Sequence, residues 1–358
     1  MIRKIIRPIH LIVGLISGLV LFTVSITGCI TSFEEEIRSV VYSDLMEVEE
    51  SSTQPKSKDE ILLIAQKYNA KEEVKNIRIK PLKTSSVEVQ FQNRESVYIN
   101  PYSGKVMGKI NRETDFFGTV LEIHKNLYLG ETGELITSTS VCLFLIMIIS
   151  GMILWWPRNK AIIKQKFTIM WKVNKQKRNY DLHSVLGFYA SWVIIFTVLT
   201  GLIWSFDWAE DTMYWLSNSK KSPRIEVESQ LQEGKAPYSI DAIYAKSISK
   251  FPEHKECIIN LPEGEKGSYR VMFRYHEKGF YRKLDNLFFD QYSGEIVKER
   301  LFSDVSTGDK LRMTNENIHT GKVFGLFGQL LVFFASLICA SLPITGFMIW
   351  RAKSNFKK

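Results

Sequence analysis

The stretch from Asp181 to Trp204, DLHSVLGFYASWVIIFTVLTGLIW, contains a histidine, an uncharged apolar run and a Thr-Gly pair. The same arrangement opens the chain, where His10 precedes an apolar run that reaches Thr27-Gly28. The spacing from His10 to Gly28 equals the spacing from His183 to Gly201. A pattern that recurs at fixed spacing indicates an internal repeat.

A second spacing recurs beside the first. The spacing from His124 to Gly151 equals the spacing from His319 to Gly346. Three further positions match at the same offset as these two pairs, namely Gly130 with Gly325, Gly133 with Gly328 and Trp155 with Trp350. We therefore predict a tandem duplication of a unit with two hydrophobic segments, in which each segment carries one histidine near its start.

Four segments are long enough and apolar enough to cross a bilayer. They contain no charged side chain, and they cover residues 11–30, 135–156, 185–206 and 323–350. About 20 apolar residues suffice for a transmembrane helix. The alternative, four long all-round apolar helices in the core of one soluble protein, is a poor match to a chain of 358 residues. We expect a membrane α-helical bundle of four transmembrane helices.

The basic residues are concentrated in three segments, residues 1–10, 157–182 and 351–358. These segments hold 15 of the 47 basic residues and one of the 38 acidic residues. By the positive-inside rule both termini and the basic loop 157–182 are cytoplasmic, and residues 31–123 and 207–318 are exported. This orientation predicts a bacterial inner membrane protein with two periplasmic modules. Attraction to anionic lipid explains the basic loop, so we expect no nucleic-acid partner.

Cys29 follows Ile26-Thr27-Gly28, and this start resembles a lipoprotein signal whose cleavage would remove His10. However, Thr-Gly or Ser-Gly ends every span, so we interpret Cys29 as a neighbour of the repeat motif. The four cysteines indicate no disulfide framework. No Cys-x-x-Cys-His motif for covalent haem attachment is present.

Each exported segment is predicted to be a small α+β module, with a helix packed on an antiparallel sheet. The first runs from helical 58–68 through three strand-like segments to the turn Asn100–Gly104. The second runs from helical 240–251 through three strand-like segments to the turn Asp290–Gly294. Glycine at the end of each turn suits a backbone position with positive φ, and Asn or Asp suits the turn start.

This order resembles the PepSY-associated transmembrane family, which includes iron-regulated inner-membrane proteins and FoxB-type ferric-siderophore reductases. Two sequence patterns carry the resemblance. Each exported module ends on Tyr-Ser-Gly, followed by Lys or Glu and then by Val or Ile. The membrane helix after each module ends on [Ser/Thr]-Gly-x-[Ile/Met]-[Leu/Ile]-Trp. It implies a haem-containing membrane oxidoreductase that delivers electrons to ferric chelates on the periplasmic side. Relatives often place Arg after the histidine, whereas this chain has Leu11, Lys125, Ser184 and Thr320 there, so haem propionate pairing at that position is not implied.

The repeat itself predicts how the histidines meet. Parallel repeats are related by a pseudo-two-fold axis along the membrane normal, and such an axis brings equivalent residues face to face. We expect His10 opposite His183 near the cytoplasmic surface and His124 opposite His319 near the periplasmic surface. Two imidazoles on opposite sides of a macrocycle give a six-coordinate haem, so these four residues are the predicted axial ligands of two b-type haems.

Bare metal ions are a poorer match to these histidines. Zinc or copper sites usually have three or four protein ligands, and the spans supply no further cluster of them. Glycines that follow the histidines either leave room for a flat ligand or allow close helix packing; they are Gly14, Gly18, Gly187, Gly321, Gly325 and Gly328. His124 lies well before the apolar run that begins at Leu135, so we expect a break or bend near Glu131–Glu134 that returns this histidine to the bundle.

No Gly-x-Gly-x-x-Gly fingerprint for a nicotinamide or flavin cofactor is present. Electrons would then come from a quinol or from a reductase that docks on the basic loop 157–182. The expected function is reduction of ferric siderophores or other ferric chelates, with Arg270, Arg274, Arg282, Trp208, Tyr214 and Trp215 as candidate substrate contacts. The alternative is a non-catalytic membrane scaffold whose PepSY modules bind or regulate an envelope partner.

Overall fold

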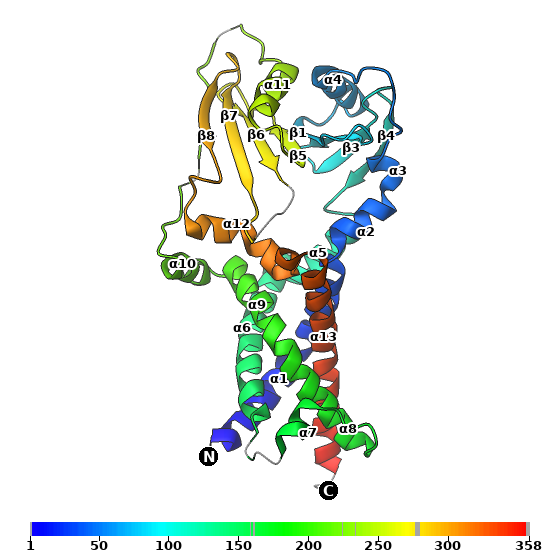
Figure 1. Cartoon of the computed structure of the whole chain (residues 1–358), viewed down its shortest axis with the longest axis vertical. Helices are drawn as coiled ribbons and strands as arrows, with labels where there is room; N and C mark the ends of the chain where they lie inside the picture. Colours follow the sequence, from blue (N-terminus) through cyan, green and yellow to red (C-terminus); the bar gives the residue numbers. More distant parts are fainter. Residues whose placement is uncertain are drawn as a thin grey trace. The chain divides into compact units, whose positions relative to one another are not determined.

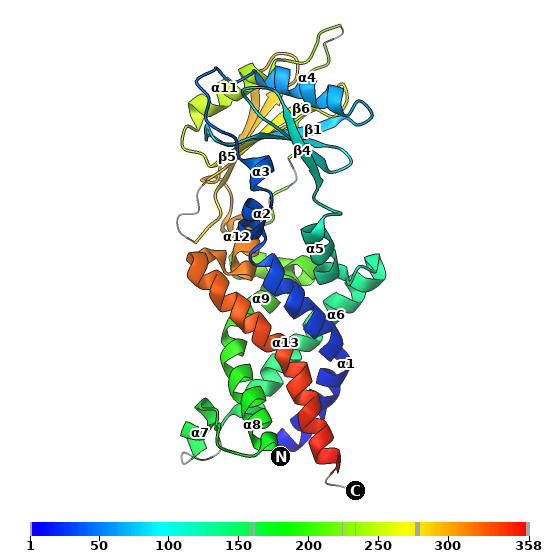
Figure 2. The same cartoon turned by 90° about the vertical axis from the view of Figure 1, so that its right-hand side faces the viewer.

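A computed structural model describes residues 2–157, 159, 162–223, 225–232, 234–275 and 280–355. The chain forms two compact units (Figures 1 and 2). The helical unit consists of Met1–Glu34, Phe116–Leu216 and Thr314–Lys358. The sheet unit consists of Glu35–Asp115 and Ser217–Met313. Each unit therefore takes residues from both sequence repeats.

The helical unit is a bundle in which α1 and α9 each pack against both α6 and α13. Its elements are α1 (Ile2–Thr31), α5 (Phe116–Asn126), α6 (Gly130–Trp155), α7 (Ile163–Phe167), α8 (Lys175–Asp181), a π-helical turn (Leu182–Leu186), α9 (Gly187–Ser205), α10 (Asp207–Leu216), the last part of α12 (Thr307–Thr320), a 3₁₀ turn (Lys322–Phe324) and α13 (Gly325–Asn355). Equivalent helices of the two repeats lie diagonally across the bundle, as a two-fold axis through its centre requires.

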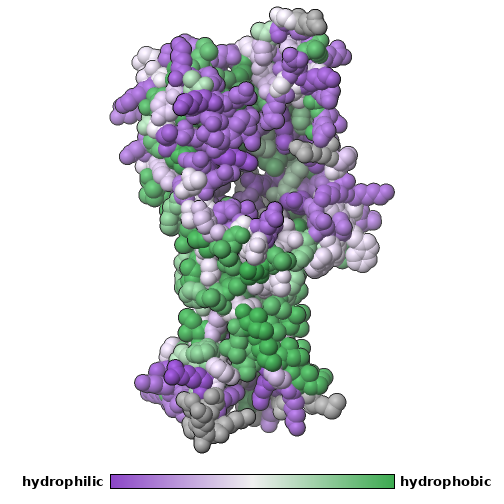
Figure 3. All heavy atoms as spheres, turned by 180° about the vertical axis from the view of Figure 1, so that it is seen from behind, coloured by the Kyte–Doolittle hydropathy of each residue, from purple (hydrophilic) through white to green (hydrophobic). Residues whose placement is uncertain are grey.

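Four helices of the bundle have the length and composition of membrane spans: Ile2–Thr31, Gly130–Trp155, Lys175–Ser205 and Lys322–Lys353. Large apolar side chains such as Ile16 and Leu19 are exposed on them. The face in Figure 3 shows hydrophobic residues gathered over this bundle. Exposed apolar surface of this kind is stable in lipid rather than in water. The predicted multi-pass membrane fold with four transmembrane helices is confirmed.

The approach of His124 and His319 to the bundle is broken at equivalent places. Between α5 and α6, Leu127 and Tyr128 have positive φ, and Gly130 has φ 58°. Before α13, Gly321 and Gly325 have φ 82° and 59°. The sequence predicted a break near Glu131–Glu134, and the structure has it just before that segment. Gly130 and Gly325, which occupy matched positions, permit the left-handed backbone.

The tight turns also need Gly133 and Gly328. A Cβ atom on Gly133 would lie 1.6 Å from the carbonyl oxygen of Asn126, and one on Gly328 would lie 2.1 Å from that of Gly321. No side chain fits at these separations. These two glycines therefore occupy equivalent positions because both repeats fold the incoming helix closely onto the span.

The sheet unit has one eight-stranded antiparallel sheet in the order β4-β3-β2-β1-β5-β6-β7-β8. Its elements are α2 (Glu34–Val41), α3 (Ser43–Met46), α4 (Lys58–Tyr68), β1 (Val74–Ile79), β2 (Val87–Phe91), β3 (Glu95–Ile99), β4 (Val106–Asn111), α11 (Ile240–Lys250), β5 (Glu256–Asn260), β6 (Ser268–Arg274), β7 (Leu284–Asp290) and β8 (Ile296–Arg300). The predicted α+β modules are confirmed.

The two modules are joined edge to edge, which the sequence did not predict. Strand β1 pairs with β5, with Ile77 opposite Ile259. An unpaired strand edge exposes backbone N–H and C=O groups, and pairing two such edges satisfies both. Each module also has a fourth strand, β4 or β8, which continues the chain after the predicted Tyr-Ser-Gly turn.

Helices α4 and α11 cover the same face of this sheet (Figure 2). Ile61 and Ile243 from the helices pack into a core with strand residues that include Ile77, Ile259 and Phe273, and all five side chains are essentially inaccessible to solvent. Burial of each such side chain contributes about 1.5–3 kcal/mol. The turns before β4 and β8 have glycine at positive φ as predicted, with Gly104 at 74° and Gly294 at 65°.

The two helices cap each other at their amino-terminal ends. The Asp241 carboxylate accepts hydrogen bonds from the backbone N–H groups of Lys58 (2.9 Å) and Asp59 (3.2 Å). The Asp59 carboxylate accepts from the N–H of Ile240 at 3.1 Å and from the hydroxyl of Ser239 at 2.6 Å. Each carboxylate thus satisfies donors that the other helix leaves unpaired, and it lies at the positive end of that helix.

We predict that Asp59→Ala lowers the free energy of unfolding of the sheet unit by about 0.5–2 kcal/mol, because α11 loses its cap. Burial raises the pKa of Asp59, but hydrogen bonds from Ser239, Ile240 and Asp241 outweigh it and hold the pKa below the ordinary 3.8. The stabilisation is therefore present above pH 3.8 and is lost as the pH falls through the folded-state pKa.

Urea unfolding of the detergent-purified protein, followed by circular dichroism at pH 7 and pH 3, measures this effect. Replacement of the exposed Glu253 by Ala serves as the control, and it should leave the transition unchanged. Equal midpoints for wild type and Asp59→Ala at pH 7 would contradict the capping role.

Candidate functional site

The helical unit brings the four repeated histidines together in two pairs. The ring centroids of His10 and His183 lie 6.4 Å apart, and those of His124 and His319 lie 6.1 Å apart. The two rings of each pair are nearly perpendicular, with interplanar angles of 89° and 83°. His10 belongs to α1 and His183 to the π-helical turn, whereas His124 and His319 lie near the ends of α5 and α12. Each pair therefore joins one residue from each repeat, as the two-fold axis predicts.

Every one of these histidines makes a hydrogen bond from Nδ1 to a hydroxyl on a neighbouring span. The partners and the distances from Nδ1 are Ser150 Oγ for His10 (2.8 Å), Thr27 Oγ1 for His124 (3.0 Å), Thr345 Oγ1 for His183 (2.9 Å) and Thr200 Oγ1 for His319 (2.9 Å). The four hydroxyls belong to the Ser-Gly and Thr-Gly pairs that end the four spans. The bond always joins two segments of the same repeat.

These contacts favour the tautomer that carries its hydrogen on Nδ1. Each hydroxyl has a single hydrogen, and it donates that hydrogen to a carbonyl of its own helix: Thr27 to Thr23 at 2.8 Å and Thr200 to Phe196 at 2.7 Å. Thr345 and Ser150 do the same at 3.0 and 3.2 Å. With its hydrogen used in this way, the hydroxyl would accept from Nδ1–H, which would leave the lone pair of Nε2 available to a ligand.

The glycine of each Ser-Gly or Thr-Gly pair lies against the same imidazole. A Cβ atom on Gly28 would lie 3.2 Å from Cε1 of His124, and one on Gly151 would lie 3.3 Å from Cε1 of His10. Gly346 and His183 repeat this contact at 3.2 Å, and Gly201 is 3.8 Å from His319 by the same measure. The two-residue motif therefore has two parts, a hydroxyl that fixes the ring and a glycine that leaves space for it.

The glycines that follow the histidines have other roles. Gly14 lies against Met147, Gly18 against Pro343 and Gly187 against Leu342, so these three allow close packing of neighbouring helices. The glycines after His319 shape the turn into α13. The sequence left two interpretations open for these glycines, room for a flat ligand or close helix packing. The contacts of Gly14, Gly18 and Gly187 support close packing.

The pairs fit a bis-histidine haem site by distance. An imidazole nitrogen lies about 2.0–2.1 Å from a bound metal, and the centre of a five-membered ring with bonds near 1.33 Å lies about 1.1 Å beyond that nitrogen. Two rings on one metal then have centroids about 6.2–6.4 Å apart, close to the observed 6.4 and 6.1 Å. Two protein ligands suffice where a macrocycle supplies the others.

The described residues form no site for a bare metal ion. Within that part of the chain, no group of three or more His, Cys, Asp or Glu side chains is placed to hold one. The four cysteines are free. A metal held by either pair would therefore take its other donors from outside the described side chains.

The surroundings keep the His124–His319 pair neutral and hold its rings in place. Burial lowers the pKa of His124 to about 4 and that of His319 to about 3, so both rings are uncharged at neutral pH. The Trp204 ring packs against His319 with centroids 5.1 Å apart. In the other pair, His183 lies on a π-helical turn, a distortion that is frequent at functional sites.

The other candidate residues belong to other elements. His254 belongs to the sheet unit, where its Nδ1 bonds to the carbonyl oxygen of Phe251 at 2.8 Å, and His276 lies outside the described residues. Arg270 and Arg274 lie on β6, whereas Trp208 and Trp215 are exposed on α10. The Ser and Thr partners were missed as site residues, although their recurrence at the end of all four spans was the available signal.

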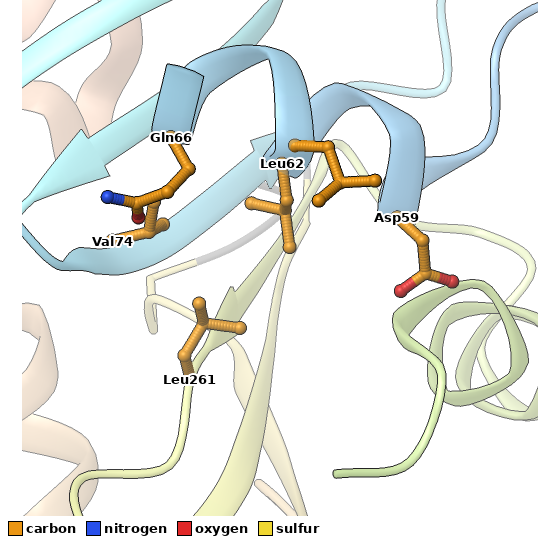
Figure 4. A pocket seen from close by; sticks show the side chains of 6 residues that line it. Asp59, Leu62, Gln66, Val74 and Leu261 are labelled. Atoms are coloured by element: carbon orange, nitrogen blue, oxygen red, sulfur yellow. The ribbon is translucent and has the colours of Figure 1, made fainter. Parts of the chain in front are cut away.

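A pocket of the sheet unit lies beside α4 (Figure 4). Its lining is mainly apolar, and the carboxylate of Asp59 at its edge is already engaged by the α11 amino terminus. None of its lining residues is a histidine or a cysteine.

Comparison with known proteins places this architecture in a family. No curated protein matches the chain in sequence. One family model, described as the PepSY-associated TM region, matches residues 7–353 and so includes both repeats, all four spans and the four paired histidines. The chain belongs to the PepSY-associated transmembrane family.

Proposed function

We propose that the protein is a haem-containing membrane oxidoreductase that passes electrons across the inner membrane to ferric siderophores or other ferric chelates on the periplasmic side. The observation that supports this most strongly is the presence of two histidine pairs, each with Nδ1 fixed by a hydroxyl and centroids at the separation of two axial ligands. When bound, a bis-histidine haem supplies one-electron transfer without an open iron position for oxygen.

The chain's own residues hold the two sites at opposite ends of the spans. His10 lies near the start of α1, and His124 is held by Thr27 near its end. At 1.5 Å per residue these points are about 25 Å apart along the helix, similar to the ~30 Å thickness of the hydrocarbon core. Sites at both surfaces suit transport of electrons through the membrane.

With a haem bound, the four hydroxyls would hold the imidazoles in one orientation, so the histidine side chains would not have to reorient when the charge on the iron changed. The apolar helices exclude water from the bundle. The basic loop 157–182 would face the cytoplasm by the positive-inside rule, where a reductase could dock, and a quinol from the lipid is the alternative donor. Release and uptake of iron would follow reduction of the chelate.

We predict that the detergent-purified protein has a Soret band that shifts on addition of dithionite, with about two haems per chain. His10→Ala or His183→Ala should remove one haem, because each site loses an axial ligand, and His124→Ala or His319→Ala should remove the other. Absorption spectra with a haem-to-protein ratio measure both effects.

The matched control is His254→Asn, which removes a histidine from the sheet unit while keeping a donor for the carbonyl of Phe251. It should retain both haems. A purified protein without a Soret band, or one whose band survives all four alanine substitutions, would contradict the proposal. If those substitutions leave cellular activity intact while changes in the sheet abolish it, a non-catalytic scaffold becomes the better account.

We also predict that Thr27→Val lowers the affinity for the haem at the His124–His319 site by about 10–100-fold, because His124 loses the hydroxyl that fixes its Nδ1. Thr27→Ser keeps the hydroxyl and should bind as wild type does. Titration of haem into protein purified without it, followed in the Soret region, compares the three proteins. Equal affinities for Thr27→Val and Thr27→Ser would show that the hydroxyl has no such role.

A further inference from the structure

An asparagine lies four residues before each histidine of the second repeat. Asn179 precedes His183, and Asn315 precedes His319. Two apolar residues occupy the equivalent positions of the first repeat, and they are Ile6 and Val120. The two repeats therefore differ about one helical turn before the histidine, although they share the histidine itself.

Asn179 bonds to the same threonine as the histidine that follows it. Its Nδ2 donates to the carbonyl oxygen of Thr345 at 3.0 Å, and the hydroxyl of Thr345 lies 2.9 Å from Nδ1 of His183. A carbonyl oxygen has two lone pairs, so it can accept this bond beside the one within its own helix. Two bonds therefore join Thr345 in α13 to the segment that carries His183.

The same arrangement occurs at the other pair. Asn315 Nδ2 donates to the carbonyl oxygen of Thr200 at 3.0 Å, and Thr200 Oγ1 lies 2.9 Å from Nδ1 of His319. Asn315 and His319 belong to α12, and residues four apart lie on one face of a helix. Both second-repeat histidines thus share one threonine with an asparagine one turn earlier.

In the first repeat the equivalent positions provide the hydroxyl bond without the amide. His10 is bonded by Ser150 and His124 by Thr27. The residues four positions earlier have no side-chain donor, and they are Ile6 and Val120. A single bond leaves a side chain free to pivot about it, whereas a second bond one turn away fixes the helix against its partner. Each histidine pair therefore joins one member with this second tie to one member without it.

Asn315 occupies a place where an amide is costly. It is 1% exposed, and its Oδ1 has no hydrogen-bond partner among the described residues. A buried polar atom without a partner is destabilising. Val120, at the equivalent position of the first repeat, is also buried, so the fold accepts an apolar residue there. The amide is therefore better explained by the threonine that its Nδ2 holds than by the stability of α12.

We propose that Asn179 and Asn315 are positioning residues that make His183 and His319 the more rigidly held axial ligand of each pair. Partners behind a metal ligand orient that ligand and raise its affinity for the metal. That these histidines bind haem iron rests on the proposed function. The tie from asparagine through threonine to imidazole rests only on the contacts within the bundle.

Nitrogen-15 NMR of the histidine-labelled protein, purified in detergent without haem, tests the tie in the absence of any cofactor. Ring-nitrogen signals report the tautomer and the motion of an imidazole, and the spectrum of His183→Ala identifies those of His183. Asn179→Leu keeps the size of the side chain and removes its donor, so the His183 signals should broaden or show a second tautomer. Thr212→Val is the control, because it removes a hydroxyl that donates to a backbone carbonyl of α10 at 2.7 Å, and it should leave those signals unchanged.

Titration of haem into the same proteins measures the consequence for the ligand. In a His124→Ala background only the His10–His183 site remains, and there Asn179→Leu should weaken haem binding about two- to tenfold, the net value of one hydrogen bond between uncharged groups. Asn315→Leu in a His10→Ala background should have the same effect at the other site, and it decides the matter if Asn179→Leu fails to fold.

Unchanged ring signals in the leucine variants would overturn the positioning role, and so would an equal change in Thr212→Val. Altered signals with unchanged haem affinity would overturn the link to the axial ligand. If the wild type binds no haem, the proposed function fails, whereas altered His183 signals in Asn179→Leu would still support the tie between asparagine and imidazole.

Discussion

The hydrogen bond between a histidine Nδ1 and a Ser or Thr hydroxyl is the contact on which the helical unit depends. It occurs four times, at 2.8–3.0 Å, and each time the hydroxyl belongs to the last part of a span and the histidine to the approach of another. An imidazole in a membrane bundle is costly unless its polar atoms are satisfied. This one bond satisfies Nδ1, fixes the tautomer and sets the distance between two helices.

The hydrogen bonds act within each repeat, and the histidine pairs connect the two repeats. The hydrogen bonds link two segments within one repeat, whereas the rings of each pair come from different repeats. The turns that deliver His124 and His319 to the bundle are built at matched positions, with positive φ at Gly130 and Gly325. Each repeat therefore supplies one histidine to each pair.

In the sheet unit the duplicated modules are joined directly to each other. Its two modules pair edge to edge through β1 and β5, and their helices exchange carboxylate caps through Asp59 and Asp241. The covered face is nearly symmetric and apolar, whereas the opposite face is not. Arg78 belongs to the first module and Glu256 to the second, so the ion pair between them exists only because the modules share one sheet.

The sequence by itself determined the repeat, the four spans, the multi-pass membrane fold and the positions of the four histidines, because spacing and hydropathy are properties of a linear chain. It also predicted that His10 faces His183, since parallel repeats require such an axis. Only the tertiary structure decided that Ser150, Thr27, Thr345 and Thr200 bond to the histidines, that the two modules share one sheet and that Arg78 pairs with Glu256 across their boundary. The histidines and their hydroxyl partners lie 97 to 162 residues apart in the chain, and contacts at such separations depend on how helices pack rather than on any local pattern.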